Sequence, residues 1–573
     1  MSFKINSLYL SDGYKVGHKA MLAPGTTKLY GTWIPRSTKH APEGITKIVS
    51  FGQQLVWKWL HDEFEENFFN AVELEYERIL VEDSPRPYWY NKPTGKILSK
   101  GKEAALKFAK DMSSYLGMEY DGKHFEELWD LGYLPIKVKA LPEGIETNPN
   151  IPHMTFVNTV DGFAWLTLYL ETIVSSLAWK PSTAATIAKL YRRQAEEWVK
   201  KTDPSNLGLI DFMCHDFSAR GLDPMSQYLI GLGHATSFKG SDTLPVIPAS
   251  RYFYGVKDDE MPIYSVNASE HSVSTTKIFT VGEQQMIADW LKIFPKGILS
   301  VVSDTFDLWK LITEYLPANK DAIMARDGKL VIRPDSGDPV DILCGEHEPY
   351  RVISKKVIDK PFSLPTGQKF MFLEESGEGK YYTKTSDGYV DYVYEPKHKG
   401  VIELLWDIFG GTTNEQGYKV LYPHIGAIYG DSITPERQLE IYRRLAAKGF
   451  AVTNVVLGIG SFTYQYNTRD TLGFAAKGAW FEVKDTSKCN CGHTIECDCI
   501  KEYNIYKDPV TDDGVKRSLK GLLQVKLVDN EYIVNQECSW EQEEDSELKT
   551  IYENGIFKNQ VTFQDVRNNL TKI

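Results

Sequence analysis

The sequence has 573 residues with 65 basic and 77 acidic side chains, and its net charge of −12 argues against a nucleic-acid or anionic-membrane partner. The length exceeds that of a usual single domain, and the hydrophobic (42%) and charged (25%) fractions are typical of a globular enzyme. The first residues hold no apolar segment of signal-peptide length, and the apolar stretch 166–179 contains Glu171 and is too short to span a bilayer. We therefore expect a cytoplasmic protein with two or more domains.

The first 165 residues mix helical and strand patterns. After a polar loop that contains Tyr14, apolar residues recur with helical periodicity from about residue 53 to residue 130. Residues 134–141 and 149–157 are typical of strands and turns. We predict an N-terminal α+β region over residues 1–165.

Residues 163–179 and 184–201 are predicted to form two long helices, and a repeated pattern of strand, polar tip and helix follows them. This alternation is typical of a (β/α) barrel with a site at the carboxyl ends of its strands. An open doubly wound sheet would give the same alternation but would concentrate its polar tips near one switch point. Because nearly every strand ends in Asp, His, Gly, Arg or Ser, we predict an irregular α/β barrel over residues 166–465. The strand-like runs include 208–214, 263–266, 298–302, 330–332, 425–428 and 452–457.

Residues 346–399 interrupt the predicted barrel. The segment is rich in Lys, Glu, Tyr and Gly and holds short strand-like pieces, so we interpret it as a hairpin insertion without a chemical role. Residues 466–573 again show strand and turn patterns, as the opening region does. We therefore expect this C-terminal segment to pack with the N-terminal region as one α+β domain beside the barrel.

Four of the seven cysteines cluster in a predicted hairpin at 489–499. In a cytoplasmic chain such a cluster is more often a metal site than a disulfide pair, so structural zinc is one interpretation. The Cys-x-Cys spacing is tighter than the usual Cys-x-x-Cys, and a reduced hairpin without metal is the alternative. The candidate ligands are Cys489, Cys491, Cys497 and Cys499.

A dense group of polar residues follows the apolar run 330–332. Arg333, Asp335, Ser336 and Gly337 provide a guanidinium, a carboxylate, a hydroxyl and a position for close approach within five residues. This combination suits a phosphorylated sugar, because arginine binds anions and carboxylates bind sugar hydroxyls or a metal ion. The alternative is an ordinary surface turn.

The other predicted tips exclude several classes of enzyme. They hold His271 beside Glu270, and a Gly-x-Gly-Ser turn that ends in Gly460 and Ser461 and matches the phosphate cradle of late barrel strands. No Gly-x-Ser-x-Gly elbow occurs on these strands, which argues against a serine hydrolase. The absence of a His-x-His pair argues against a histidine-rich metallohydrolase.

Nine short motifs follow one another along the chain: Asp12-Gly13-Tyr14-Lys15-Val16, His215-Asp216-Phe217, Phe238-Lys239-Gly240-Ser241-Asp242-Thr243, Glu270-His271-Ser272, Val301-Val302-Ser303-Asp304, Ile332-Arg333-Pro334-Asp335-Ser336-Gly337, Gly430-Asp431, Thr468-Arg469-Asp470 and Lys507-Asp508-Pro509. In this order they resemble the nicotinate/nicotinamide phosphoribosyltransferase family, from about residue 8 to the C-terminus. The resemblance implies a homodimer with a barrel-containing fold and active sites at the subunit interface. It also implies condensation of nicotinamide with 5-phosphoribosyl 1-pyrophosphate in NAD salvage.

The resemblance assigns the base-binding residues. Phe217 and, from the other subunit, Tyr14 would clamp the flat pyridine ring, and Arg333 would border the ring and the sugar phosphate. The Asp242 carboxylate would accept a hydrogen bond from the carboxamide of nicotinamide and repel the carboxylate of nicotinic acid. Without the resemblance, a helix cap or a buried ion-pair partner is an equal interpretation of Asp242. The resemblance also places Arg220 and Ser265 at this substrate site.

The resemblance assigns the phosphate and ribose contacts as well. Mg2+ would bridge pyrophosphate and ribose. Asp335 and Asp431, which follows Gly430, would hold the ribose hydroxyls, while Gly460 and Ser461 receive the 5′-phosphate. The residues assigned to the remaining phosphates are Arg36, Arg469, Lys477 and Lys507.

His271 has a separate role in the family that the chain resembles. It would be phosphorylated by ATP as a co-substrate, in a coupled hydrolysis that pulls synthesis forward. Glu270 and Asp304 would orient its ring and select the tautomer. Without the resemblance, a satisfied core histidine is the alternative interpretation.

Two positions depart from the family pattern. The glycine run at Gly460-Ser461-Phe462 is shorter than in the family, and Gly426 stands where the family has an arginine. A phosphate contact is then missing or is supplied from elsewhere. Two rival functions also stay open at this stage: a nicotinate phosphoribosyltransferase, against which Asp242 argues, and a catalytically silent binding homologue.

Overall fold

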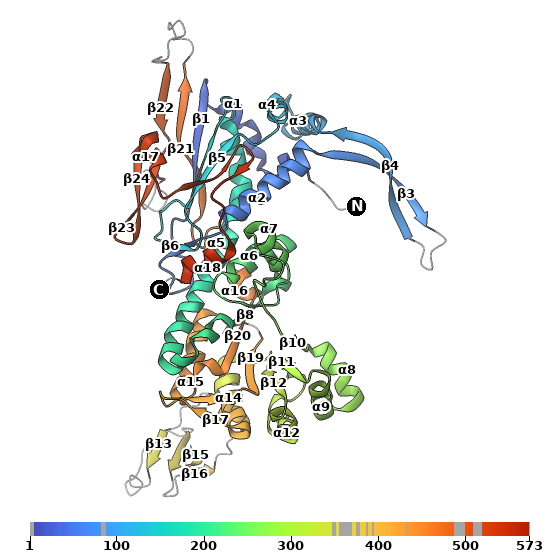
Figure 1. The fold of residues 1–573 in the computed structure, drawn as a ribbon, viewed down its shortest axis with the longest axis vertical. Helices are drawn as coiled ribbons and strands as arrows, with labels where there is room; N and C mark the ends of the chain where they lie inside the picture. Colours follow the sequence, from blue (N-terminus) through green and yellow to red (C-terminus); the bar gives the residue numbers. More distant parts are fainter. Residues whose placement is uncertain are drawn as a thin grey trace.

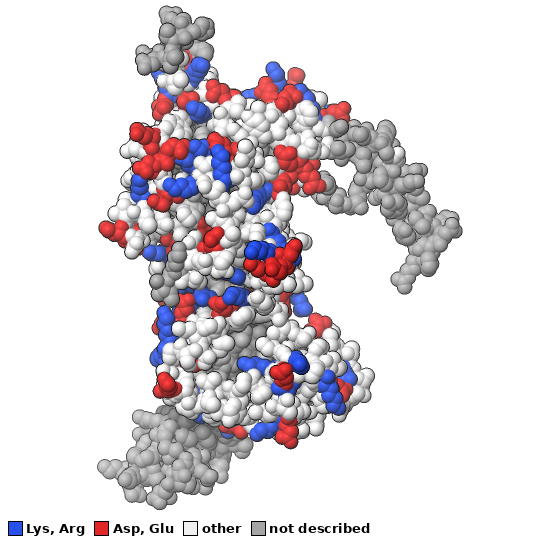
Figure 2. All heavy atoms as spheres, viewed as in Figure 1, with Lys and Arg blue, Asp and Glu red and all other residues white. Residues whose placement is uncertain are grey.

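A computed structural model describes residues 5–81, 88–346, 351–354, 369–373, 379–385, 388–391, 395–430, 432–485, 499–507 and 518–571. The molecule is elongated, with an antiparallel sheet at one end and a parallel barrel toward the other (Figure 1). Acidic and basic side chains are interspersed over the face that Figure 2 shows.

The antiparallel sheet is built from both ends of the chain. Its inner strand β1 (Thr26–Ile34) pairs with β21 (Ala475–Lys484) on one side and with β7 (Met154–Asn158) on the other. This arrangement confirms the prediction that the terminal regions form one α+β unit. The full order is β22 (Ile500–Asn504), β21, β1, β7, β5 (Ile136–Ala140), β25 (Lys549–Glu553) and β26 (Ile556–Phe557).

The second seven-stranded sheet is parallel and forms an irregular barrel, as predicted. Its strands are mostly short apolar runs that are buried, as expected for parallel strands covered by helices. At one edge of the sheet, Gly240 of β9 forms a parallel bridge with Tyr264. Tyr264 lies just before β10, the strand at the opposite edge, so this bridge closes the ring irregularly. The order is β10 (Asn267–Ala268), β11 (Lys296–Val302), β12 (Asp327–Arg333), β19 (Ile425–Tyr429), β20 (Val455–Gly460), β8 (Cys214–Phe217) and β9 (Gly240–Ser241).

A helix follows the carboxyl end of each barrel strand. Because parallel strands place all their carboxyl ends on one side, the polar tips predicted from the sequence gather at one face. The helices are α1 (His18–Met21), α2 (Gln53–Phe64), α3 (Lys102–Leu116), α4 (Lys123–Leu131), α5 (Ala164–Thr202), α6 (Pro224–Ala235), α7 (Val246–Tyr254), α8 (His271–Val281), α9 (Glu283–Ile293), α10 (Leu308–Lys310), α11 (Leu316–Ala318), α12 (Lys320–Met324), α13 (Pro339–Cys344), α14 (Pro396–Phe409), α15 (Pro435–Ala447), α16 (Ser461–Gln465), α17 (Trp540–Glu544) and α18 (Phe563–Thr571).

The two long helices predicted around residue 180 are one helix, α5, which runs from the antiparallel sheet to the barrel (Figure 1). Pro181 lies inside it and removes one backbone donor, which usually ends or kinks a helix. Tertiary packing holds α5 together at this point: Pro181 lies against Gly52, where a Cβ would be 2.3 Å from its Cγ, and the Ser182 hydroxyl donates to the carbonyl oxygen of Val49 (2.5 Å).

The prediction of continuous helical periodicity from 53 to 130 is wrong between α2 and α3. Strands β3 (Val72–Val81) and β4 (Tyr88–Lys100) form an antiparallel pair that projects from the body (Figure 1). Alternation of apolar residues with Glu73, Glu75 and Glu77 is a period of two, which favours a strand.

Three predicted barrel strands are displaced. The predicted strand 452–457 begins as a 3-10 helix (Val452–Asn454), and β20 runs on to Gly460, so that the predicted turn at 458–460 lies within the strand. Residues 204–212 form a 3-10 helix that Pro204 begins, and β8 starts only at Cys214, so that His215 to Phe217 lie within the strand. The predicted strand 263–266 is reduced to the bridge at Tyr264, and the regular strand β10 starts at Asn267.

The insertion at 346–399 is more than the predicted hairpin. Its described strands form a four-stranded sheet in the order β13 (Arg351–Ser354), β14 (Lys369–Leu373), β15 (Gly379–Thr385) and β16 (Gly388–Asp391). Three further two-stranded pairs complete the strands: β2 (Ile48–Ser50) with β6 (Ile145–Thr147), β17 (Gly411–Thr413) with β18 (Lys419–Leu421), and β23 (Leu522–Val528) with β24 (Glu531–Cys538).

Candidate active site

The carboxyl end of β8 positions the centre of the site. The Asp216 side chain is fully buried, and its Oδ2 accepts a hydrogen bond from the Thr243 hydroxyl (2.7 Å). The Asp242 amide donates to the carbonyl oxygen of Asp216 (3.0 Å). These bonds fasten the loop after β9 to β8, while His215 and Phe217 lie on the opposite face of the strand.

Asp242 is held as an ionised carboxylate. Its Oδ1 lies 2.9 Å from His215 Nε2 and also accepts a hydrogen bond from the Ser265 hydroxyl. Burial raises the pKa of Asp242, but the hydrogen bonds from His215 and Ser265 and the charge of Arg333 outweigh burial, so that the pKa is below its ordinary value. The side chain is 41% exposed, and it therefore combines a fixed charge with access to a ligand.

The two aromatic residues predicted to clamp a ring lie in different parts of the chain. The Phe217 ring is tilted against His215, with 4.6 Å between ring centroids. Tyr14 is 65% exposed and contacts His18 and Lys15 in the region before β1. Within the described part of this single chain, Tyr14 forms no ring contact with Phe217, so their pairing across subunits stays a prediction.

His271 begins α8 and faces the tip of β11. Its Nε2 lies 3.6 Å from Asp304 Oδ1, and its Nδ1 lies 3.3 Å from the Thr305 hydroxyl. The Asp304 side chain is 6% exposed, and its Oδ2 accepts hydrogen bonds from the Asp335 amide (2.9 Å) and the Ser336 hydroxyl (2.5 Å). Asp304 therefore couples the histidine to the tip of β12. His271 itself is 46% exposed, which is unlike a core histidine.

The neighbouring Glu270 does not share these partners. Its carboxylate lies 3.4 Å from Arg220 Nη2, and both side chains are largely exposed. This pair joins the loop after β8 to the loop after β10. The partners of the His271 ring are Asp304 and Thr305 among the described residues, so the predicted orienting role of Glu270 stays a prediction.

Glycines allow close approach between the tips of β12, β19 and β20. A Cβ on Gly430 would lie 2.2 Å from Asp335 Oδ1, and a Cβ on Gly458 would lie 2.5 Å from the carbonyl oxygen of Gly430. At the next tip, Ser461 fills the space beside Gly221, where a Cβ would lie 2.2 Å from the Ser461 Cβ. The predicted phosphate turn thus packs directly on the loop that contains Arg220.

A second group of cations lies in the sheet domain. Arg36 Nε donates to the Gly473 carbonyl oxygen (3.0 Å), and burial together with the nearby Arg469 lowers the pKa of Arg36. Lys477 lies 3.6 Å from Glu171, which also pairs with the buried Lys15 at 2.6 Å. In the described ranges, no hydrogen bond or ion pair joins Arg36, Arg469 or Lys477 to the barrel tips.

Comparison with known proteins identifies the family. The model of the nicotinate phosphoribosyltransferase (NAPRTase) family matches residues 212–556, which is more than half of the chain. The chain is 34% identical to the nicotinamide phosphoribosyltransferase of Acinetobacter baylyi, with 100% of this chain and 98% of that protein covered. The chain belongs to the nicotinate phosphoribosyltransferase family.

Two further relatives complete the comparison. The nicotinamide phosphoribosyltransferase of Xanthomonas campestris is 29% identical over 76% of this chain and 79% of that protein. The solved structure of human nicotinic acid phosphoribosyltransferase aligns over 98% of this chain and 92% of that chain, with 14% identity and a TM-score of 0.48. As a member of this phosphoribosyltransferase family, the chain is a transferase of NAD biosynthesis.

Four predicted site positions of this phosphoribosyltransferase lie outside the described residues: Asp431, Cys489, Cys491 and Cys497. Cys499 is described and buried, at the edge of the undescribed segment. Lys507 is exposed, and its amide donates to the Ser518 hydroxyl (2.8 Å). Structural zinc at the cysteine hairpin stays a prediction.

The described residues fit Mg2+ only together with a phosphorylated substrate. Among them, no three His, Cys, Asp or Glu side chains gather closely enough to hold a metal ion. Asp304 Oδ1 is buried without a hydrogen bond, and Asp335 stands beside it at the tip. Mg2+ commonly takes one or two carboxylates and completes its octahedron with substrate phosphates and water, which matches this donor set.

Two contacts near the candidate site were not anticipated from the sequence. His215 lies in one of the nine motifs, but its contact with Asp242 was not predicted, because the two residues are 27 positions apart in the sequence. The position of Gly426 beside β12 was also unforeseen: a Cβ there would lie 3.3 Å from Cδ of Lys329, whose pKa burial lowers. No helix in the described part of the chain is long and apolar enough to cross a membrane.

Proposed function

We propose that this phosphoribosyltransferase transfers the phosphoribosyl group of 5-phosphoribosyl 1-pyrophosphate to the ring nitrogen of nicotinamide. The products are nicotinamide mononucleotide and pyrophosphate. The observation that carries the proposal is the ionised Asp242 at the barrel tips, which His215 and Ser265 hold and which the charge of Arg333 stabilises. The names of the relatives from Acinetobacter baylyi and Xanthomonas campestris support the amide as substrate.

Recognition of the base follows from the charge of Asp242. Its Oδ1 is occupied by His215 and Ser265, so Oδ2 is the oxygen that accepts the carboxamide N–H. An ionised acceptor pairs with an amide donor, whereas the carboxylate of nicotinic acid would meet a like charge. The Phe217 ring supplies one stacking face, and Tyr14 of a second copy would supply the other.

The reaction breaks the bond from C1 of the ribose to the pyrophosphate oxygen and forms the bond from C1 to the pyridine nitrogen. The nitrogen lone pair supplies the new bond, and the pyrophosphate leaves with the electron pair of the old one. Catalysis then requires alignment of the ring with C1 and neutralisation of the leaving group. Asp335 and the Gly430 tip hold the ribose, Gly460 and Ser461 receive the 5′-phosphate, and Arg36, Arg469, Lys477 and Lys507 neutralise the pyrophosphate.

Bound Mg2+ would offset the charge of the pyrophosphate, with Asp335 and Asp304 as its protein-side neighbours. Because Arg36, Arg469 and Lys477 form no hydrogen bond or ion pair with the barrel tips within the described part of one chain, a homodimer offers a direct way to complete the site. Arg36 and Tyr14 of one protomer would then face the tips of its partner.

A competition assay tests the substrate. Wild-type enzyme with phosphoribosyl pyrophosphate and Mg2+ is expected to convert nicotinamide and to leave nicotinic acid largely unused. Asp242→Ala is expected to lower kcat/KM for nicotinamide by about 10–100-fold, because a hydrogen bond to a charged group is lost. Asp242→Asn, which keeps the shape and removes the charge, should be relaxed toward the acid. Turnover of nicotinic acid alone by wild type would agree with the family assignment but would reject nicotinamide as the substrate. No turnover of either base would favour a catalytically silent homologue.

We further propose that ATP phosphorylates His271 and that hydrolysis of the phosphohistidine drives synthesis forward. The exposed ring, with Asp304 beside Nε2, is compatible with transfer of a phosphoryl group to an imidazole nitrogen.

His271→Ala is expected to abolish both the acid-labile label from γ-labelled ATP and the stimulation of synthesis by ATP, while basal transfer persists. The control is His424→Ala, because His424 lies just before β19 and thus at the opposite end of the barrel, where it contacts the Gly328 carbonyl oxygen. Undiminished labelling of His271→Ala would refute the coupling mechanism.

A further inference from the structure

We infer that His215 is a positioning residue that sets the selectivity of the site for amide over acid by fixing the Asp242 carboxylate. The inference rests on the proposed function, in which Asp242 contacts the base. His215 itself need not touch the substrate, because its imidazole contacts Asp242 Oδ1 and leaves Oδ2 for a ligand.

The contacts leave one defined oxygen of Asp242 for a ligand. His215 Nε2 and the Ser265 hydroxyl both reach Oδ1, the first at 2.9 Å. Within the described residues, Oδ2 has no hydrogen-bond partner. Two bonds to one oxygen fix the plane and direction of the carboxylate, so the free oxygen points in one direction. Positioning of this kind determines how well a small planar amide is discriminated from its acid.

His215 is well suited to act as the anchor. Its side chain is 11% exposed and lies between the Phe217 ring and the backbone at Gly240, where a Cβ would be 2.9 Å from His215 Nδ1. Only glycine allows β9 to approach the imidazole this closely. Because a carboxylate is solely an acceptor, Nε2 must carry the hydrogen of this bond.

The charge of Asp242 also depends on His215. The groups that face the carboxylate are His215 from β8, Ser265 from the loop before β10 and Arg333 from β12. Burial acts in the opposite direction and favours the protonated acid. Without His215, the pKa of Asp242 rises, and a protonated Asp242 donates a hydrogen bond to the carboxylate of nicotinic acid. Loss of His215 should therefore make selectivity pH-dependent.

The test compares kcat/KM for nicotinamide and for nicotinic acid between pH 5.5 and pH 8 in full-length wild type, His215→Phe and His215→Gln. Wild type is expected to keep a constant ratio in favour of the amide. His215→Phe, which keeps the ring and removes the donor, should lower this ratio about 10–100-fold at pH 6 and less at pH 8, mainly through KM. His215→Gln restores a donor and should recover most of the ratio.

His124→Phe is the matched control. His124 is also a buried histidine among aromatic rings, but it lies on α4, and burial lowers its pKa to about 3, so that it stays neutral. The ratio should be unchanged in this variant. Equal losses for both bases in His215→Phe at every pH, or no rescue by glutamine, would overturn the inference and leave the proposed function intact. A wild-type enzyme without preference for the amide would instead overturn the proposed function and, with it, the role of His215.

Discussion

Gly430→Ala is expected to lower kcat/KM for phosphoribosyl transfer about hundredfold while the fold is retained. The new Cβ would lie 2.2 Å from Oδ1 and 3.1 Å from Cγ of Asp335, so the carboxylate must rotate away. Asp335 is exposed, and its rotation costs little stability. Its displacement moves a predicted ribose contact by about 1 Å or more, and a misplacement of this size at a reacting group commonly reduces the rate by about two orders of magnitude.

The measurement is steady-state kinetics with both substrates, together with thermal unfolding. Gly208→Ala is the matched control, because a Cβ on Gly208 meets no atom within 4 Å and its backbone is not in the left-handed region. It should leave kcat/KM unchanged. A Gly430→Ala enzyme with wild-type kinetics would show that Asp335 does not hold the substrate at this tip.

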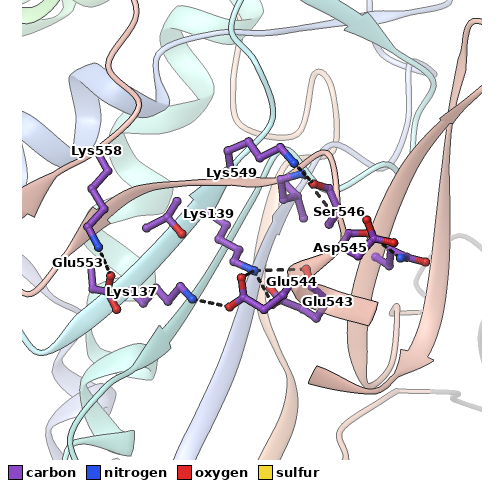
Figure 3. Close-up of polar contacts among 12 residues, drawn as sticks. Lys137, Lys139, Glu543, Glu544, Asp545, Ser546, Lys549, Glu553 and Lys558 are labelled. Carbon is purple, nitrogen blue, oxygen red and sulfur yellow. Dashed lines mark hydrogen bonds and ion pairs between the residues drawn. The ribbon is translucent and has the colours of Figure 1, made fainter. Parts of the chain in front are cut away.

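Lys139→Met is expected to lower the free energy of unfolding by about 3–5 kcal/mol, because it leaves a buried carboxylate without its partner. Lys139 Nζ lies 2.7 Å from Glu543 Oε2, and these side chains are 5% and 2% exposed (Figure 3). The pair joins β5 to α17 and so attaches the C-terminal segment to the N-terminal half of the sheet. The adjacent Tyr30 hydroxyl is buried without a hydrogen bond among the described residues, and it offers no replacement charge.

The size of this loss should depend on pH. Burial raises the pKa of Glu543 above its ordinary value, although Lys139 acts in the opposite direction. A carboxyl group with a raised pKa in the folded state destabilises the protein as pH rises from its ordinary pKa through the raised value. Removal of Lys139 raises the pKa further. Lys139→Met should therefore lose more stability at pH 8 than at pH 5, because the lower pH favours the protonated form of Glu543.

Chemical denaturation at these two pH values measures the effect. Lys558→Met is the control, since Lys558 and Glu553 form a pair at 2.5 Å with exposed fractions of 45% and 30% (Figure 3). Exposed pairs contribute about 0–1 kcal/mol, so this variant should be close to wild type. Replacing both partners, as in Lys139→Met with Glu543→Leu, should restore much of the stability. A Lys139→Met protein as stable as Lys558→Met would show that Glu543 reaches water.

Local patterns were sufficient for much of the barrel. The apolar runs at β11, β12 and β19 were predicted near their observed positions, because most residues of these runs are buried in the sheet. The nine ordered motifs likewise indicated the family correctly. Each of them is a short run of neighbouring residues, and most lie at strand tips, so a reading along the chain is enough to find them.

Two predictions failed for different physical reasons. Pro181 predicts a break in α5, yet contacts of Pro181 with Gly52 and of Ser182 with Val49 stabilise a continuous helix. The apolar residues before Cys214 predict a strand, yet Pro204 begins a 3-10 helix there. In α5 the energy that decides the conformation comes from distant residues, which a window along the chain does not contain. Before Cys214 the deciding residue is local, because Pro204 favours the first turn of a helix.

The alternation of strand, polar tip and helix was enough to predict the barrel, and the resemblance carried by the nine motifs indicated the family and supplied the candidate site residues. Which of those residues meet follows only from the folded arrangement. His215 reaches Asp242 across 27 positions, and Lys139 reaches Glu543 across 404. Such pairs form because strand order and helix packing bring remote segments within hydrogen-bond distance. The residues near each partner in the sequence do not determine which remote segment will lie beside it.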